Sequence, residues 1–526
     1  MTVLTSSPPV GPVSGGRSRP VATSLIVLTG VFLSSLDLFI VNIAFPSISA
    51  TYHGESLSSI SWVLSAYTIV FAAALVPAGR WADRAGRKRA FLLGLGIFTA
   101  ASALCAVAPT LGFLVGARVV QALGGALMLP TSLGLLLPAF GPARKGAAIG
   151  LWSAVGGAAA AFGPPIGGLL VQASWRWVFL VNLPFSVVAL VFGGRVLHEV
   201  RDPAARRADL LGAALLSVSV ASLVAGIVEG HDWGWTSARI LGVFAVAVAS
   251  GAWLVVRSRH HPSPVVEPAV IRHRAVALAD VSSLLFFGGF GALVLGGVLF
   301  LTGVWHESVL RAGFMIAPGP LMAGLTAFPG GVLGARFGHR AVGTVGSLLF
   351  AAGGVFWVTH LGTTPDWVGA YLPGSVLTGV GVGLMLPSLG GAATAPLPPE
   401  RFATGTALYA MTRQIGVALG VAGLVAILGT TSGPGPTAFH HAWIFMIACS
   451  LAAGLVLQGI GTRAKETADA DAVALDARPA VAVPSVPAVA PVAPVAPVAP
   501  VAPMAQVVQS VPVLPAGAAV GCAATP

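Results

Sequence analysis

Charged side chains are scarce in this sequence. Only 9% of the 526 residues are Asp, Glu, Lys or Arg, whereas 56% are hydrophobic. Soluble domains carry about 25% charged residues, so this chain could not cover an ordinary water-exposed surface. Apolar segments that face lipid remove the difficulty. The shortage of charge therefore indicates a protein embedded in a membrane.

Cysteines and nucleotide-binding loops are also few or missing. The three cysteines, Cys105, Cys449 and Cys522, lie far apart and show no metal-ligand spacing, so no metal site is expected. The sequence contains no GxxxxGK[ST] phosphate loop, which argues against an ATP-driven protein. A net charge of +11 could suggest nucleic acid, but the basic residues are scattered between apolar segments and form no basic domain or arm. Nucleic acid is therefore not an expected partner.

What the sequence does have is long apolar runs. A membrane-spanning helix needs about 20 mostly apolar residues, and fourteen segments meet this requirement. They cover residues 24–45, 59–79, 90–108, 112–137, 147–170, 177–196, 209–228, 239–256, 277–302, 312–333, 342–360, 370–395, 404–428 and 440–460.

The positions of Lys and Arg test this count. With a cytoplasmic N-terminus, 23 of the 28 basic residues fall in cytoplasmic segments, as the preference of basic residues for the inside requires. Arg176, Arg239 and Arg311 fall outside, and Arg118 and Arg413 lie within or beside spans. Dropping one span in the middle would move the later arginines to the wrong side. We therefore expect fourteen spans with both termini in the cytoplasm.

Two short patterns recur in the same order. A glycine followed by arginine five residues on and by glycine seven residues on occurs in Gly79–Arg89 and again, 252 residues later, in Gly331–Arg340. The tetrapeptide at Leu127–Pro130 recurs at Leu384–Pro387, 257 residues later. Both glycine–arginine loops are cytoplasmic in the predicted topology, so the repeats are parallel and eight spans apart. A duplication of six helices with two helices inserted gives this separation, and parallel halves are a recurrent design of secondary transporters.

The predicted fold is an all-α integral membrane bundle of two parallel six-helix halves plus two inserted helices. The C-terminal segment is rich in Ala, Val and Pro, and regularly spaced proline prevents helix and sheet. The predicted parts are a cytoplasmic N-terminal tail (1–22), an N-terminal six-helix half (23–200), two inserted helices with their flanking loops (201–268), a C-terminal six-helix half (269–461) and a disordered cytoplasmic tail (462–526).

Five motifs carry a resemblance to a known family. They are Leu36–Pro46 (LDLFIVNIAFP) in the first span, Gly79–Arg89 (GRWADRAGRKR) in a cytoplasmic loop, Arg118–Gln121 (RVVQ) in the fourth span, Gly163–Gly168 (GPPIGG) in the fifth span, and Trp175–Pro184 (WRWVFLVNLP). Set in this order, they resemble the fourteen-helix drug:proton antiporter branch of the major facilitator superfamily. The chain departs from the usual pattern at Phe39, Ala122 and Ala159, where a threonine and two glycines are usual.

The resemblance implies a proton-coupled secondary active transporter that exports amphipathic or cationic drugs or antibiotics across the plasma membrane by alternating access. It would be no enzyme, would need no cofactor besides the proton gradient, and would work as a monomer in the lipid bilayer. A dedicated exporter of one metabolite, lipid or self-made antibiotic is an alternative, and a non-transporting receptor or scaffold is another. The Ala- and Pro-rich composition suggests a high-GC bacterial genome, and hence a bacterial plasma membrane.

Asp37 and Arg118 are the charged residues that lie deepest in predicted spans. Asp37 lies about 20 Å from the cytoplasmic end at 1.5 Å per residue, where a carboxylate needs a partner, a cavity or a proton. Its functional interpretation is proton coupling and substrate binding; the structural alternative is a hydrogen bond with Asn42 or a helix end. Arg118 is either a proton-relay element or a helix-packing lock. The sequence leaves open whether the two side chains meet.

The loop residues Asp83, Arg84, Gly86 and Arg87 are candidates for conformational gating. Anchoring on the cytoplasmic side explains the arginines but leaves Asp83 unexplained. The hypothesis is that Asp83 pairs with a basic residue or a helix end on the other half and so holds one access state.

In the fifth span, Gly163, Pro164, Gly167 and Gly168 combine small residues with a break in the hydrogen-bond ladder. Close helix packing at a bend is the structural interpretation. Sealing or hinging of the two halves is the functional interpretation, and the two are compatible.

Other polar residues in the spans carry weaker hypotheses. Asp280 either lines a cavity or reaches the interface, and Arg413 with Gln414 is expected to pack the second half. The histidines near span ends, such as His339 and His360, are expected at the interface. The tenth span carries no acidic residue, which argues against dicationic substrates because some members of the resembled family use one there.

Overall fold

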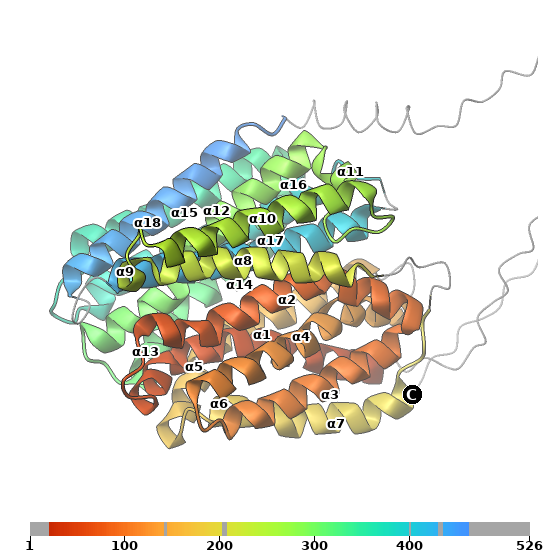
Figure 1. Cartoon of the computed structure of the whole chain (residues 1–526), viewed down its shortest axis with the longest axis horizontal. Coiled ribbons are helices and arrows are strands. Elements are labelled where there is room, and N and C mark those ends of the chain that lie inside the picture. The colour runs from red at the N-terminus through yellow and green to blue at the C-terminus, as the bar shows by residue number, and fades with distance from the viewer. Residues whose placement is uncertain (1–19, 141–144, 202–207, 399–400, 430–434, 462–526) are drawn as a thin grey trace, which may run out of the picture. The chain divides into compact units, whose positions relative to one another are not determined.

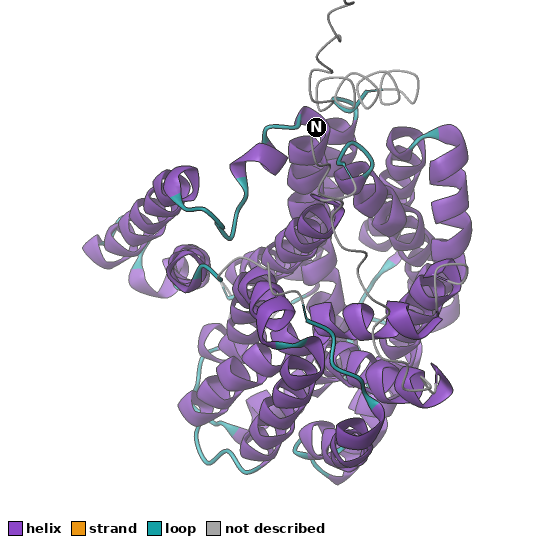
Figure 2. Cartoon of the chain, turned by 90° about the vertical axis from the view of Figure 1, so that its right-hand side faces the viewer, coloured by secondary structure: helices purple, strands orange, loops and turns teal. Residues whose placement is uncertain are grey.

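The computed structural model describes residues 20–140, 145–201, 208–398, 401–429 and 435–461. Within these ranges the chain forms helices and loops and no strand, as Figure 2 shows. In this described part of the chain, fourteen helices are long and apolar enough to cross a membrane, which confirms the predicted count. The predicted tails at 1–22 and 462–526 lie outside the described residues, apart from the first turn at Pro20.

The helices and their labels in Figure 1 follow the chain. They are α1 (Pro20–Thr51), α2 (Leu57–Ala85), α3 (Arg87–Ala106), α4 (Leu111–Phe140), α5 (Lys145–Ala173), α6 (Trp177–Leu180), α7 (Asn182–Val196), α8 (Leu210–Val228), α9 (Gly230–Trp233), α10 (Ala238–His260), α11 (Pro268–Ile271), α12 (Arg274–Gly303), α13 (Val309–Ile316), α14 (Pro318–Phe337), α15 (His339–His360), the π-helix η2 (Trp367–Tyr371), α16 (Leu372–Thr394), α17 (Phe402–Leu428) and α18 (Pro436–Leu457).

Three of the fourteen spans are interrupted within the described ranges. The sixth consists of α6 and α7, the tenth of α13 and α14, and the twelfth begins with the π-helix η2 before α16. In the tenth span the break falls at Ala317, directly before Pro318, and a residue before proline is disfavoured in a helix. Other prolines, such as Pro46 and Pro130, lie inside continuous helices, which membrane helices tolerate because neighbouring groups satisfy the freed carbonyls.

The two halves repeat each other in their packing. In the N-terminal half, made of α1 to α7, helix α4 packs against α2 and α3, and α1 packs against α5. In the C-terminal half, made of α12 to α18, helix α16 packs against α14 and α15, and α12 packs against α17. Each helix therefore has a counterpart in the other half, in the same chain order, as the parallel repeat predicts.

Close glycine contacts recur in both halves. A Cβ on Gly124 of α4 would lie 2.7 Å from the Gly94 carbonyl oxygen and 2.6 Å from the Phe98 nitrogen of α3. In the second half, a Cβ on Gly381 of α16 would lie 2.7 Å from the carbonyl oxygen of Gly346, and it would meet the Phe350 nitrogen of α15 at 2.6 Å. Small residues allow this backbone approach in membrane helices. The same geometry at the same offsets supports the internal repeat at atomic detail.

The inserted helices α8 and α10 form a hairpin that lies against both halves. Helix α8 contacts α2 of the first half and α17 of the second, and Figure 1 shows the pair in front of the bundle. The Asp209 carboxylate caps α8 by accepting from the Gly212 nitrogen at 2.9 Å, and it accepts from the Arg257 guanidinium of α10 at 3.0 Å. Burial opposes ionisation of Asp209, but these two donors prevail and lower its pKa.

Besides α8, direct contacts between described helices join the halves: α2 packs against α17, α5 against α13 and α14, and α1 against α12 and α13. At the α5 seam, a Cβ on Gly168 would lie 2.9 Å from the Leu310 Cα of α13, so the backbones touch. Towards the N-terminal end of α5 the seam loosens. A Cβ on Gly157 would meet its nearest atom, the Gly324 Cα, at 3.9 Å, and one on Gly150 would meet nothing within 4 Å. The α5 seam is therefore tightly packed near Gly168 and looser towards the end of the bundle that carries the Gly79–Arg89 loop.

Candidate functional site

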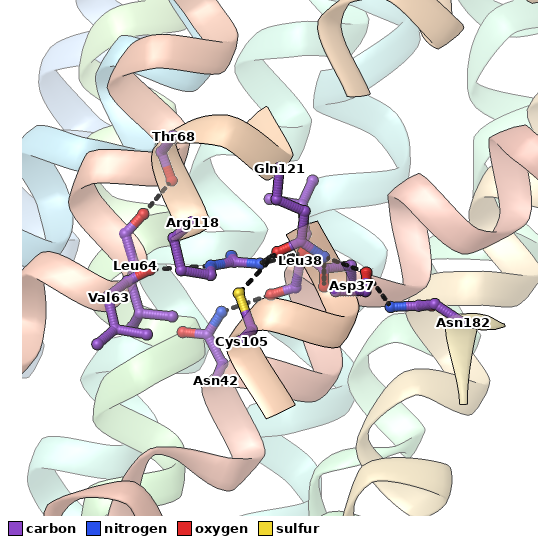
Figure 3. A network of polar contacts seen from close by, with 11 residues as sticks. Asp37, Leu38, Asn42, Val63, Leu64, Thr68, Cys105, Arg118, Gln121 and Asn182 are labelled. Carbon is purple, nitrogen blue, oxygen red and sulfur yellow. Dashed lines mark hydrogen bonds and ion pairs between the residues drawn. The ribbon is translucent and has the colours of Figure 1, made fainter. Parts of the chain in front are cut away.

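Asp37 is the eighteenth of the 32 residues of α1 and is completely buried. Arg118 of α4 is buried to the same degree, with 1% of its side chain exposed. The two form an ion pair in which the Arg118 Nη1 lies 2.5 Å from the Asp37 Oδ2. The structure thus brings together the two residues whose contact the sequence left open (Figure 3).

Gln121 closes a triangle with this pair. Its Nε2 donates to the second carboxylate oxygen, Asp37 Oδ1, at 3.0 Å, and its Oε1 accepts from the Arg118 Nη1 at 2.7 Å. Arg118 and Gln121 are three residues apart on α4 and so share one helix face. Both carboxylate oxygens therefore have donors, as a buried charge requires.

Three further helices hold the triangle in place. The Arg118 Nε donates to the Val63 carbonyl of α2 at 3.1 Å, and the guanidinium carbon lies 4.0 Å from the centre of the Tyr67 ring. Ser102 of α3 accepts from the Gln121 Nε2 at 2.9 Å and from the Asn182 Nδ2 of α7 at 3.4 Å. The site therefore lies wholly inside the N-terminal half, between α1, α2, α3, α4 and α7 (Figure 3).

The hydrogen bond between Asp37 and Asn42, one form of the structural alternative, is not among those of the described residues. Asn42 donates to the Leu38 carbonyl of its own helix at 2.6 Å, not to Asp37. Three partners in the network received no role in the sequence interpretation: Gln121, Ser102 and Asn182. The signal for Gln121 was present in its three-residue spacing from Arg118, whereas Ser102 and Asn182 look like ordinary polar residues of α3 and α7.

The gating candidates lie at the junction of α2 and α3. Asp83 pairs with Arg87 of the same loop, Oδ1 to Nε at 2.8 Å, and Arg87 also donates to the Gly134 carbonyl of α4 at 3.2 Å. Arg84 is exposed. Among the described residues Asp83 makes no ion pair with the other half, so the pairing across the halves stays a prediction for another conformation.

Gly86 connects this loop to the segment after α7. Its backbone has φ +115°, which favours glycine, and a Cβ would lie 2.5 Å from the Glu199 carboxylate. Glu199 accepts from the Lys88 backbone nitrogen at 3.0 Å, and the Arg87 nitrogen donates to the Val200 carbonyl at 2.9 Å. Sequence reasoning missed Glu199. Gly338 has φ +91° at the corresponding place in the second half.

The fifth-span motif faces two neighbours. Cβ atoms on Gly163 and Gly167 would clash with α1 side chains, at Phe39 and Ile43 respectively, so these glycines allow α1 to approach. Pro164 and Gly168 contact α13 of the C-terminal half, where a Cβ on Gly313 would strike the Pro164 carbonyl. The motif therefore lies at the closed end of the seam between the halves. In the described part of the chain no group of three or more His, Cys, Asp or Glu side chains could hold a metal ion.

Curated relatives are similar to this chain over most of its length. It is 32% identical over 425 residues to the methylenomycin A resistance protein of Streptomyces coelicolor, covering 80% of this chain and 88% of the relative. It is 33% identical to the tetracenomycin C resistance and export protein of Streptomyces glaucescens, covering 80% and 78%. A multidrug resistance protein B homolog of Mycobacterium tuberculosis is 30% identical, covering 84% and 82%.

Solved structures show the same fold at low sequence identity. A POT family transporter in complex with 5-aminolevulinic acid has a TM-score of 0.63 at 15% identity and covers 86% of this chain and 98% of its own. A nucleoside transporter has a TM-score of 0.60 at 13% identity, covering 84% and 99%. A sequence model of the Major Facilitator Superfamily matches residues 27–420. This chain belongs to the major facilitator superfamily, and it is related to exporters that confer drug and antibiotic resistance.

Proposed function

We propose that this transporter is a proton-coupled antiporter that exports amphipathic drugs or antibiotics across a bacterial plasma membrane. The observation that carries the proposal is the buried triangle of Asp37, Arg118 and Gln121. A carboxylate at mid-helix of a membrane span is costly unless it is paired or protonated, and such residues mark ion pathways rather than ordinary packing.

Proton exchange at Asp37 would change the site in a defined way. Protonation removes the charge that the Arg118 guanidinium pairs with, and breaking a buried pair costs about 3–5 kcal/mol because it leaves an unpaired charge. Arg118 is held by α2 and α4 and Asp37 by α1. Loss of the pair would therefore free α1 to move against α2 and α4, which links the proton to the conformation.

The movement of the halves would take place at the seam of α5 with α13 and α14. The seam is tightly packed where Gly168 of α5 lies against α13, and looser towards the end with the Gly79–Arg89 loop. If that loop is cytoplasmic, this conformation opens to the cytoplasm. Asp83, Arg84, Gly86 and Arg87 would then gate the open end, while Gly163, Pro164, Gly167 and Gly168 seal the other. Asp37 is completely buried here, so a drug would not contact it in this conformation. Protonation of Asp37 would therefore affect drug binding through helix movement.

Two sources of evidence support the substrate class. The names of similar proteins include resistance to methylenomycin A, resistance to and export of tetracenomycin C, and multidrug resistance. The helices of the tenth span, α13 and α14, carry no acidic residue that would pair with a second cationic group. A monocationic or neutral amphipathic compound fits better than a dicationic one.

The test is transport by purified protein in liposomes with an imposed pH gradient, using ethidium as the cationic probe. We expect Asp37→Asn to slow gradient-driven uptake by about 5- to 150-fold, the range of a typical coupling free energy, and to keep ethidium exchange without a gradient. Asp366→Asn is the matched control because its side chain only caps η2, at 2.8 Å from the Gly369 nitrogen, and Asn can make the same bond. Equal gradient-driven rates in wild type and Asp37→Asn would refute the proposal.

A dedicated exporter of one antibiotic is the second candidate, favoured by the two Streptomyces relatives that are named for single compounds. Competition separates the two. Broad export predicts that unrelated amphipathic compounds all slow ethidium uptake, whereas a specialist predicts inhibition by one compound class only.

A further inference from the structure

Asp280 is a second buried carboxyl group of the transporter. It is the seventh residue of α12, and 9% of the residue is exposed. Both carboxyl oxygens are inaccessible, and neither has a hydrogen-bond partner or an ion pair among the described residues. The carboxyl group is therefore enclosed by protein and does not extend to solvent, as a side chain reaching out to the interface would.

Polar groups on the packed helices α12 and α17 do not supply a hydrogen-bond partner for the Asp280 carboxyl group. Helices α12 and α17 pack backbone to backbone here, since a Cβ on Gly416 would lie 2.7 Å from the Leu284 carbonyl oxygen. The Ser283 Oγ on α12 and the Gln414 Nε2 on α17 are also buried without a described partner. Tyr409 of α17 donates its hydroxyl hydrogen to the Leu386 carbonyl at 3.0 Å and so does not serve Asp280.

The helix that packs against α12 carries one cation in its middle, Arg413. The Arg413 guanidinium lies 5.7 Å from the centre of the Phe287 ring, and Phe287 is seven residues, about two turns, beyond Asp280 on α12. Arg413 and Tyr409 are four residues apart on α17 and so share one face of this helix. Of the other described helices packed on α12, α11 and α16 contain no ionisable residue, and the histidines of α18, His440 and His441, lie near its other end. The charged residues of α1 and α13 have partners of their own, since Asp37 pairs with Arg118 and Arg311 with Glu307.

Asp280 and Asp37 are thus in opposite situations within one conformation. The two carboxylate oxygens of Asp37 accept hydrogen bonds from Arg118 and Gln121, and the ion pair with Arg118 is formed. An ionised Asp280 would be a buried charge without a partner, which costs several kcal/mol, and such a group takes up a proton instead. Of the two buried aspartates, Asp280 is therefore the one with a neutral, protonated carboxyl group.

We propose that Asp280 is a second proton-binding site of the transporter, in the C-terminal half, loaded in the conformation described here. When the halves move, the O–H bond of Asp280 breaks, the proton passes to water on the side then open, and the carboxylate that remains pairs with the Arg413 guanidinium. The role of Asp280 in coupling rests on the proposed proton antiport. Whether Asp280 carries a proton can nevertheless be measured without transport.

The first measurement is infrared difference spectroscopy of the purified protein at neutral pH. Wild type minus Asp280→Asn should show the C=O stretching band of a neutral carboxyl group, and wild type minus Asp366→Asn should lack it because Asp366 is exposed. Asn has the shape of the protonated side chain, so the melting temperature of Asp280→Asn should equal that of wild type. A carboxylate band in place of the neutral band would overturn the proposal.

The second measurement is the ratio of protons to ethidium transported in liposomes. We expect Asp280→Asn to move about one proton fewer per substrate than wild type while it keeps ethidium exchange, and Asp280→Glu to restore the ratio. An unchanged ratio in Asp280→Asn, or lost exchange at a normal melting temperature, would overturn the proposal. If wild type itself moved no protons, the proposed function would fail, and the infrared result would still decide whether Asp280 holds a proton.

Discussion

At the scale of single residues, Gly86 combines two constraints that can be separated. Its φ of +115° is a backbone conformation close to glycine-only, and a Cβ would collide with Glu199. Gly54 also has a positive φ, +89°, but a Cβ there would meet nothing within 4 Å. Backbone strain of this kind costs about 1–3 kcal/mol.

We therefore expect Gly86→Ala to lower the melting temperature of the purified protein more than Gly54→Ala does. Both variants carry the backbone strain, and only Gly86→Ala displaces the Glu199 carboxylate that accepts from the Lys88 nitrogen. Melting in detergent, followed by tryptophan fluorescence, measures the difference. Equal shifts in the two variants would mean that the contact with Glu199 contributes nothing to stability.

The sequence predicted the charged residues of the candidate site because their burial follows from depth alone. Asp37 and Arg118 lie in the middle of long apolar segments, where a charge needs a partner. Ser102 and Asn182 could not be found this way, because an uncharged polar residue in a span has ordinary structural uses. For Asp280, the sequence left open a cavity or the interface, because the burial of its side chain depends on how α12 packs against its neighbours.

At the scale of elements, the contact of α5 with α13 exists only while the halves are packed at this end. The Gly313 backbone touches the Pro164 carbonyl, so an added methyl group penalises the packed conformation relative to any other. Overpacking costs about 1–3 kcal/mol, which shifts a two-state population about 5- to 150-fold. A Cβ on Gly324 of α14 would meet nothing within 4 Å, so this glycine supplies the matched control.

We expect Gly313→Ala to increase the population in which this end is separated, and Gly324→Ala to leave it unchanged. Spin labels on two exposed residues at this end, at Thr110 in the first half and Thr363 in the second, report the separation as a distance distribution. A distribution in Gly313→Ala identical to that of wild type would show that the α5–α13 contact does not set the conformation.

Long spans were predictable from hydropathy, and the breaks within them were not. The π-helix η2 and the break between α13 and α14 depend on which neighbours satisfy the freed backbone groups. The Trp367 indole, for instance, donates to the Met315 carbonyl at 3.1 Å, near the C-terminal end of α13. Contacts of this kind are between segments about 50 residues apart, so a local pattern does not contain them.

At the scale of the whole molecule, the described basic residues divide between the two ends of the bundle. The loops at the end with Gly86 contain Arg84, Arg87, Lys88, Arg89, Arg195, Arg201, Arg272 and Arg340 among others. The loops and helix starts at the other end contain only Arg176, Arg239 and Arg311 in the described part of the chain. Because basic residues stay in the cytoplasm, this asymmetry predicts that the Gly86 end faces inward.

We expect cysteines at the two ends to react from opposite sides of the membrane. In a variant with Cys105, Cys449 and Cys522 replaced by alanine, a single cysteine at Thr110 should react with a membrane-impermeant maleimide in intact cells. A single cysteine at His198 should react only after the cells are permeabilised. Both residues are exposed and lie outside the spans, so access rather than burial decides the outcome. The reverse labelling pattern would show that the transporter has the opposite orientation in the membrane. The conformation described here would then open to the outside, and protons would bind from the opposite side of the membrane.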